Sequence, residues 1–144
     1  MIKRKKPKHP ERTTKKKLRS ISSLKKELDT IYSLYIRQKY AEPNGNCACY
    51  TCSKQGHWKT LQNGHYISRR HHSTRWHDQN CRPQCPGCNI FNQGNAPAFA
   101  LHLVREFGPE ILEELEKIKN QTVHLDRLFY ESKIEEIKQK LNNL

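Results

Sequence analysis

Four of the six cysteines form two C-x-x-C pairs, Cys49 with Cys52 and Cys85 with Cys88. Two intervening residues allow a tight turn to direct both thiolates at one ion. Two such turns supply the tetrahedral four-sulfur shell that structural Zn²⁺ prefers. We therefore predict a structural zinc ion, whose binding free energy helps to fold a segment that is poor in aliphatic residues. The alternatives are redox-active disulfides or loose thiols.

Three residues around these pairs have side chains suited to phosphodiester hydrolysis. His65 lies between the pairs on an expected short strand, Asn80 follows a polar loop, and Asn89 directly follows Cys88. Imidazole is a natural base for deprotonating water, because its ordinary pKa is near 6.5. A carboxamide oxygen is a reasonable ligand for Mg²⁺, which stabilises the phosphorane charge and the leaving oxygen. The alternatives are a histidine bonded to the zinc loop and two asparagines that only form turns.

This order resembles the His-Asn-His (ββα-metal) endonucleases in their His-Asn-Asn form. Within that superfamily, residues 49–95 look most like the NinG (also called Rap) recombination proteins of lambdoid phages. The matching stretches are Gly64-His65-Tyr66-Ile67-Ser68-Arg69, Thr74-Arg75-Trp76, Asn80 with Pro83-Gln84-Cys85, and Cys88-Asn89 followed by Gly94-Asn95. The resemblance implies a structure-specific endonuclease that acts on branched recombination intermediates such as Holliday junctions and D-loops. The endonuclease VII junction resolvases of phages are similar, since they also pair a four-cysteine zinc site with a Cys-Asn turn.

The resemblance also implies roles for individual residues. His65 would be the general base, Asn80 would orient it and tie the hairpin, and Asn89 would be a ligand of the catalytic Mg²⁺ or Mn²⁺. Many relatives have a metal-binding side chain directly before the base, whereas this chain has Gly64 there. Asp78 is the only acid between Cys47 and Asn95 and is therefore our second candidate ligand for the catalytic ion, ahead of His71, His72 and His77; the alternative is an ordinary turn residue.

The positive charge of the chain is concentrated near its N-terminus. The formal net charge is +13, and residues 1–26 contain twelve Lys or Arg and one acid. We predict a disordered arm that contacts DNA phosphates, with a solubility or targeting tail as the alternative. The residues predicted to contact DNA are Lys15, Lys16, Lys17, Arg69, Arg70, Arg75 and Arg82. The alternative for the four arginines is a solvated basic face.

Helical apolar spacing lies on both sides of the cysteine-rich segment. The apolar stripe within residues 22–40 predicts a helix capped by Ser22 or Ser23. Three further patterns between residues 96 and 144 predict helices, the first of them capped by Asn95. This tail contains seven bases and nine acids, so we do not expect it to be the DNA surface.

Together these predictions give an α+β, mostly helical fold in which helices flank a small zinc-stapled ββα-metal unit. The expected divisions are a disordered basic arm (1–20), an N-terminal helix (21–41), a zinc-bound ββα-metal nuclease core (42–95) and C-terminal helices (96–144). Apolar residues make up 34% of the chain, so a large single core is not expected. No apolar run approaches the roughly 18 residues of a membrane-spanning helix, and the polybasic N-terminus is not a secretory signal. We expect a cytoplasmic protein that has no membrane partner.

We predict a metal-dependent endonuclease that binds branched DNA. Two matched cuts on a junction need two active sites, so we also predict a homodimer. The main alternative is a non-catalytic zinc module that binds branched or single-stranded DNA as a recombination accessory, and the lack of a carboxylate at Gly64 favours it. An RNA-binding zinc ribbon would explain the charge but not the order of His65, Asn80 and Asn89.

Overall fold

The computed structural model describes residues 18–144. The expected basic arm of residues 1–20 falls mostly outside the described residues, as do Lys15, Lys16 and Lys17, and the role of that arm stays a prediction. The described chain has a mixed α+β fold, and about half of its residues are helical. Among these residues, no helix has the length and apolar character that crossing a membrane requires.

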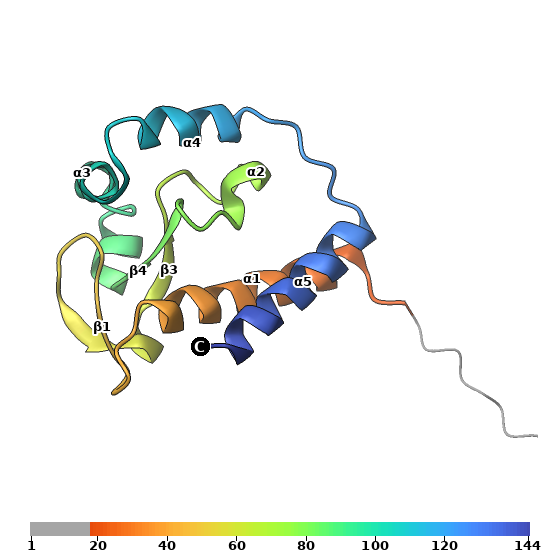
Figure 1. Ribbon diagram of the computed structural model, residues 1–144, viewed down its shortest axis with the longest axis horizontal. Coiled ribbons are helices and arrows are strands. Elements are labelled where there is room, and N and C mark those ends of the chain that lie inside the picture. The colour runs from red at the N-terminus through yellow and green to blue at the C-terminus, as the bar shows by residue number, and fades with distance from the viewer. Residues whose placement is uncertain (1–17) are drawn as a thin grey trace, which may run out of the picture.

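Two helices from opposite ends of the described chain pack side by side (Figure 1). Helix α1 spans Ile21–Lys39 and helix α5 spans Arg127–Asn142. Their apolar faces share the first core, which also includes Trp76 and Cys81 from the middle of the chain. The expected helix at 22–40 is confirmed, but its cap is Ser20, whose hydroxyl accepts from the Ser23 backbone N–H. Both Ser22 and Ser23 already lie inside the helix.

Two short antiparallel hairpins occupy the middle of the chain. Strand β1 (Asn46–Ala48) pairs with β2 (Gln55–His57), and β3 (Gln62–His65) pairs with β4 (Cys81–Gln84). A short 3-10 turn, η1 (Trp58–Thr60), joins the hairpins, and a π-helical turn, η2 (Gly87–Phe91), follows β4. In the second hairpin the pairing places His65 opposite Cys81 and Gly64 opposite Arg82. The loop between its strands contains the short helix α2 (His72–Arg75).

Two helices cover the loop of the second hairpin (Figure 1). Helix α3 spans Ala96–Phe107 and helix α4 spans Ile111–Lys119. Their buried residues form a separate core with Ile67. The three expected C-terminal helices are therefore confirmed. Asn95 occupies the N-cap position of α3 in a left-handed conformation, but its side chain makes no capping hydrogen bond.

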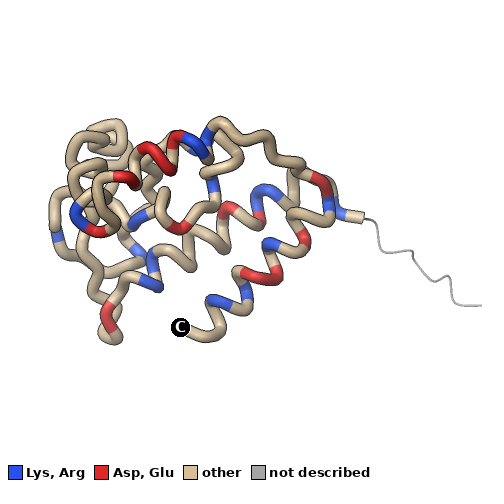
Figure 2. Tube along the Cα trace, turned by 45° about the horizontal axis from the view of Figure 1, so that its top comes forward, with Lys and Arg blue, Asp and Glu red and all other residues tan. Residues whose placement is uncertain are grey.

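The charges on the C-terminal helices are mixed in sign. In Figure 2, acidic and basic residues both occur along α4 and α5. Several of them pair within one helix, such as Lys117 with Glu113 at 2.8 Å and Lys140 with Glu136 at 2.8 Å. This mixture agrees with the expectation that the tail is not the main polyanion-binding surface.

Candidate functional site

The four paired cysteines converge in the structure. The sulfur atoms of Cys49, Cys52, Cys85 and Cys88 all lie within 4.8 Å of one another. Two Zn–S bonds of about 2.3 Å at a tetrahedral angle place their sulfurs about 3.8 Å apart. The observed distance from Cys52 Sγ to Cys85 Sγ is 3.8 Å. The residues therefore fit a zinc ion, and the four thiols could hold one.

The hydrogen bonds around these thiols also suit a metal centre. Burial opposes ionisation of Cys49, but hydrogen bonds from the backbone of Cys85, the hydroxyl of Thr51 and the backbone of Cys52 lower the pKa of its thiol to about 6. The thiolate is the form that binds a metal. Cys47 and Cys81 are also buried, but their thiols lie outside this group of four.

A cleft of about 730 Å³ lies beside this centre and receives side chains from α1, the second hairpin and η2. It brings two of the predicted catalytic residues, His65 and Asn89, onto one surface, although they are 24 positions apart in the chain. Its charged lining residues are Asp29, Arg37, Arg69 and Arg75.

The ring of His65 has a defined tautomer. Its Nε2 lies 2.9 Å from the backbone carbonyl oxygen of Arg75. Because a carbonyl can only accept a hydrogen bond, Nε2 must carry the proton, and Nδ1 retains the lone pair that a general base requires. Burial lowers the pKa of the imidazole, and the charges of Arg75 and Arg69 act in the same direction. The ring is therefore neutral at pH 7 and able to accept a proton.

Asn80 ties the loop of the second hairpin together. Its side chain is fully buried. The Oδ1 atom accepts from the Ile67 backbone N–H at 2.7 Å, and Nδ2 donates to the carbonyls of Ile67 and Thr74, each at 3.0 Å. The hydrogen bonds expected to tie the loop are therefore present. The Asn80 side chain makes no hydrogen bond to the imidazole; the backbone carbonyl of Arg75, next to Thr74, is the partner that orients His65.

Asn89 lies on η2, directly after a cysteine of the cluster. Its Nδ2 donates to Gln62 Oε1 at 2.8 Å, which orients the amide and leaves Oδ1 free to act as a ligand. Asn89 is only partly buried and lines the cleft. A neutral oxygen of this kind fits a divalent ion that keeps most of its water ligands.

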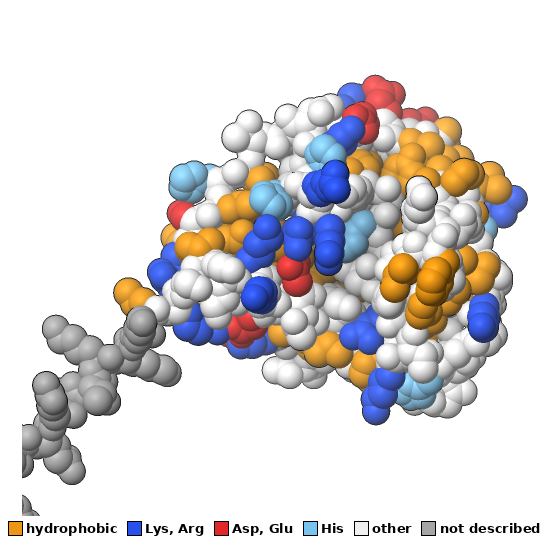
Figure 3. Space-filling model, turned by 180° about the vertical axis from the view of Figure 1, so that it is seen from behind, with side chains coloured by type: hydrophobic (Ala, Val, Ile, Leu, Met, Phe, Trp, Pro, Cys, Tyr) orange, Lys and Arg blue, Asp and Glu red, His pale blue; other side chains and the backbone are white. Residues whose placement is uncertain are grey.

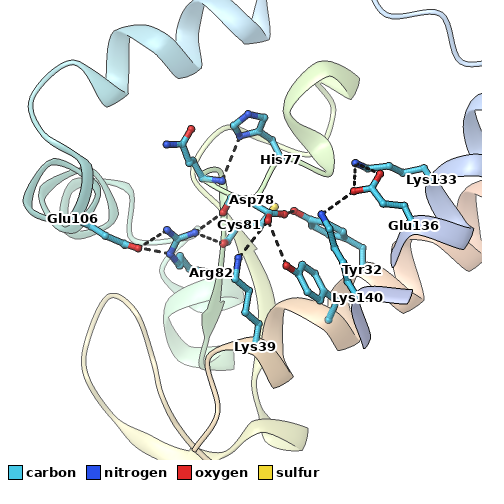
Figure 4. A network of polar contacts seen from close by, with 12 residues as sticks. Tyr32, Lys39, His77, Asp78, Cys81, Arg82, Glu106, Lys133, Glu136 and Lys140 are labelled. Atoms are coloured by element: carbon cyan, nitrogen blue, oxygen red, sulfur yellow. Dashed lines mark hydrogen bonds and ion pairs between the residues drawn. The ribbon is translucent and has the colours of Figure 1, made fainter. Parts of the chain in front are cut away.

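Asp78 does not lie among the residues that line this cleft. Its carboxylate accepts hydrogen bonds from Tyr32 Oη at 2.9 Å and Lys39 Nζ at 3.3 Å (Figure 4). Burial opposes ionisation, but these donors hold the pKa of the carboxyl below its usual value. The expectation that Asp78 assists Asn89 is therefore corrected: its turn directs the side chain to these partners on α1.

Packing also accounts for the glycine before the base. A Cβ at Gly64 would overlap the side-chain amide of Gln84, which is fully buried. The Nε2 of Gln84 donates to Thr51 Oγ1 at 3.0 Å and to the Gly94 carbonyl at 2.8 Å. The space that a carboxylate at position 64 would use is thus already occupied.

The four predicted DNA-contacting arginines have different surroundings. Arg69 and Arg70 are exposed, and Arg69 lines the cleft. Arg75 also lines the cleft, but its guanidinium binds the Asp29 carboxylate through two hydrogen bonds of 2.8 and 2.7 Å. Figure 3 shows Lys and Arg side chains gathered on one face of the molecule, with His side chains beside them.

Arg82 cannot contact a phosphate in this structure, which corrects the prediction made for it. Only 1% of its surface is exposed, and its guanidinium pairs with Glu106 on α3 at 2.8 Å (Figure 4). The guanidinium also lies 4.9 Å from the ring centroid of Tyr40 and 5.2 Å from that of Tyr50. Arg82 therefore joins the second hairpin to α3.

Asp29 and Gln62 are two functional residues of the cleft that the sequence alone did not indicate. Asp29 accepts from the Trp76 Nε1–H at 3.0 Å as well as from Arg75, while Gln62 positions Asn89. The pairing of Asp29 with Arg75 spans 46 positions, and no local pattern connects them. The contact of Gln62 with Asn89 can be recognised only once the pairing of β3 with β4 and the position of η2 are known.

Comparison with family models matches residues 2–144 to the family described as Bacteriophage Lambda NinG protein. The match covers almost the whole chain, including both cysteine pairs, the second hairpin and the C-terminal helices. Searches of the curated proteins and of the solved structures returned no significant match.

Proposed function

The chain belongs to the bacteriophage lambda NinG family, and from this premise we propose that it is a metal-dependent, structure-specific DNA endonuclease. Its substrates would be branched recombination intermediates, such as Holliday junctions and D-loops, and its reaction would be phosphodiester hydrolysis. The site would be of the His-Asn-Asn type within the ββα-metal nucleases. The observation that carries this proposal is the cleft, where an imidazole with a free Nδ1 and an oriented carboxamide line one surface.

His65 would take the proton from the attacking water. The Arg75 carbonyl holds the ring in the tautomer with Nδ1 unprotonated, and burial favours the neutral ring. A positioned general base typically contributes about 10²- to 10⁴-fold to a rate. Asn80 would act indirectly, by holding the loop that presents the Arg75 carbonyl.

Asn89 would hold the catalytic Mg²⁺ or Mn²⁺ through Oδ1. When bound, a divalent ion stabilises the phosphorane charge and the departing oxygen. Among the described residues that line the cleft, the carboxylate is that of Asp29, and it is already bound by Arg75 and Trp76. The neutral amide oxygen of Asn89 is therefore the main protein ligand available. We therefore expect weak binding of the ion by the free protein and tighter binding once a DNA phosphate adds its charge.

Arginines would hold the DNA backbone. Arg69 and Arg70 are exposed near the cleft and suit phosphate contact.

Structural zinc at the four-cysteine cluster would keep η2, and with it Asn89, in place against the second hairpin. Paired cuts on a junction would require two copies of the site, so we propose that the protein acts as a homodimer.

The test is incubation of the purified protein with a four-way junction, a flap and a linear duplex in the presence of Mg²⁺ or Mn²⁺. We expect metal-dependent cleavage of the branched substrates that is at least about 100-fold slower in His65→Ala. The matched control is His124→Ala, since the His124 side chain is 90% exposed and lies outside the cleft. Junction binding without any product, in both the parent and His65→Ala, would instead indicate a non-catalytic DNA-binding module.

A further inference from the structure

Two large apolar side chains stand exposed immediately after Asn89. Ile90 is 56% exposed and Phe91 is 84% exposed, and both lie on the turn η2. Ile90 lines the cleft. Of the large apolar residues that the structure describes, Phe91 is the one with the greatest exposed fraction. The two residues that follow Asn89, the proposed metal ligand, thus expose apolar side chains to water.

Backbone hydrogen bonds fix the turn that exposes Ile90 and Phe91. Within η2 and its end, Asn92 N–H donates to the Gly87 carbonyl at 2.9 Å, and Gly94 N–H donates to the Cys88 carbonyl at 2.8 Å. Cys88 is itself one of the four clustered thiols. The backbone that carries Ile90 and Phe91 is therefore anchored on both sides, and the two side chains are presented to solvent by a fixed support.

The charge of the adjoining cleft indicates what could cover this surface. Three arginines line the cleft, and its single acid, Asp29, is already paired with Arg75. The cleft thus favours a polyanion, while Ile90 on its wall and Phe91, the next residue in the chain, offer an apolar and aromatic surface. An unstacked base has an apolar face that suits these side chains, and the phosphates beside it carry the charge that suits the cleft.

We propose that Phe91, supported by Ile90, stacks on a base exposed at the branch point of DNA and thereby selects branched over continuous duplex. This inference rests on the proposed function, because it takes its substrate from it. In continuous duplex each base is covered on both faces by its neighbours, whereas stacking is interrupted at a branch. Trp76, an aromatic residue that lines the cleft, is 7% exposed and packs in the first core, so it is not available for stacking.

The test compares binding of Phe91→Ala and the parent to a four-way junction and to a linear duplex by fluorescence anisotropy. No Mg²⁺ or Mn²⁺ is added, so cleavage does not enter the result. We expect junction affinity to fall on the order of 10-fold and duplex affinity to stay unchanged. Phe91→Trp should retain the preference for the junction. Leu128→Ala is the matched control, since Leu128 is a 72% exposed apolar residue on α5 that does not line the cleft.

A second readout places 2-aminopurine next to the branch point. The parent should change its fluorescence on binding, and Phe91→Ala should leave it nearly unchanged. The inference is overturned if Phe91→Ala keeps the full junction preference, or if it weakens self-association in sedimentation while that preference remains, because the patch would then contact a second copy. Cleavage that fails in the parent while the preference depends on Phe91 would refute the proposed catalysis and leave this inference standing.

Discussion

Replacing Cys85 by serine tests how the centre of the molecule is stabilised. Cys85 belongs to a small core whose buried members are Leu61, Cys47 and three of the four converging cysteines, Cys49, Cys85 and Cys88. Full burial of a leucine contributes only about 1.5–3 kcal/mol. Structural zinc in small modules contributes about 10–16 kcal/mol. If the four thiols hold zinc, the ion is therefore the dominant stabilising contribution in this part of the fold.

Cys85→Ser should consequently lose zinc and local order together. We expect the parent to contain one zinc ion per chain and the variant to bind zinc more than about 100-fold more weakly. Loss of a residue that only hydrogen-bonds a metal ligand reduces metal affinity by at most about 100-fold, so a larger loss identifies Cys85 as a ligand itself. Competition with a chromophoric chelator measures the affinity. The fluorescence of Trp58, which packs against this cluster, should change, while the helical circular dichroism of α1 and α5 should largely persist.

Cys47→Ala provides the matched control for this experiment. Cys47 is buried in the same small core as Cys85, with 2% of its surface exposed, but its sulfur is not one of the four that converge. The control should keep the parent's zinc content and affinity. The reasoning is refuted if Cys85→Ser retains stoichiometric zinc at the parent's affinity, or if Cys47→Ala loses as much zinc as Cys85→Ser.

Four further predictions concern the cleft and the buried contacts. Because burial lowers the pKa of His65, the ring stays neutral until the pH falls below the ordinary imidazole pKa of about 6.5. The value of kcat/KM should therefore rise with pH with a midpoint below about 6.5. A midpoint above about 6.5 would contradict the assignment of His65 as the base. Asp78→Asn should leave the dependence of cleavage on Mg²⁺ concentration unchanged, since Asp78 does not line the cleft; a markedly higher Mg²⁺ requirement in that variant would argue against this placement. Arg69→Ala should weaken DNA binding and reduce the slope of log K against log salt by about 1, as expected for a phosphate contact. Arg82→Ala should instead cost about 2 kcal/mol or more of stability in thermal unfolding, because it empties the space of a fully buried side chain and removes its ion pair with Glu106. A loss of DNA affinity at full stability would show this assignment to be wrong.

Much of this architecture could be predicted from local patterns. The helices were predictable because apolar residues recur with helical spacing along α1 and along the C-terminal segments, and the structure confirms them. The convergence of the four thiols was predictable because each C-x-x-C spacing constrains its own turn. The helix cap at Ser20 was missed by two or three positions, since the neighbouring Ser22 and Ser23 offer the same local signal.

The placement of individual polar side chains depended on contacts distant in sequence. Arg82 and Arg69 are the same residue type in the same basic segment, yet Arg82 is buried against α3 while Arg69 is exposed at the cleft. Asp78 is close to Asn80 in the chain, yet α1 supplies its partners. Local patterns determine which residues form an element or share a turn, whereas only the packing of α1, α3 and η2 around the second hairpin decides which polar groups remain free for chemistry. The physical reason is that a side chain's exposure and partners depend on the surfaces packed against it, and these come from parts of the chain tens of residues away.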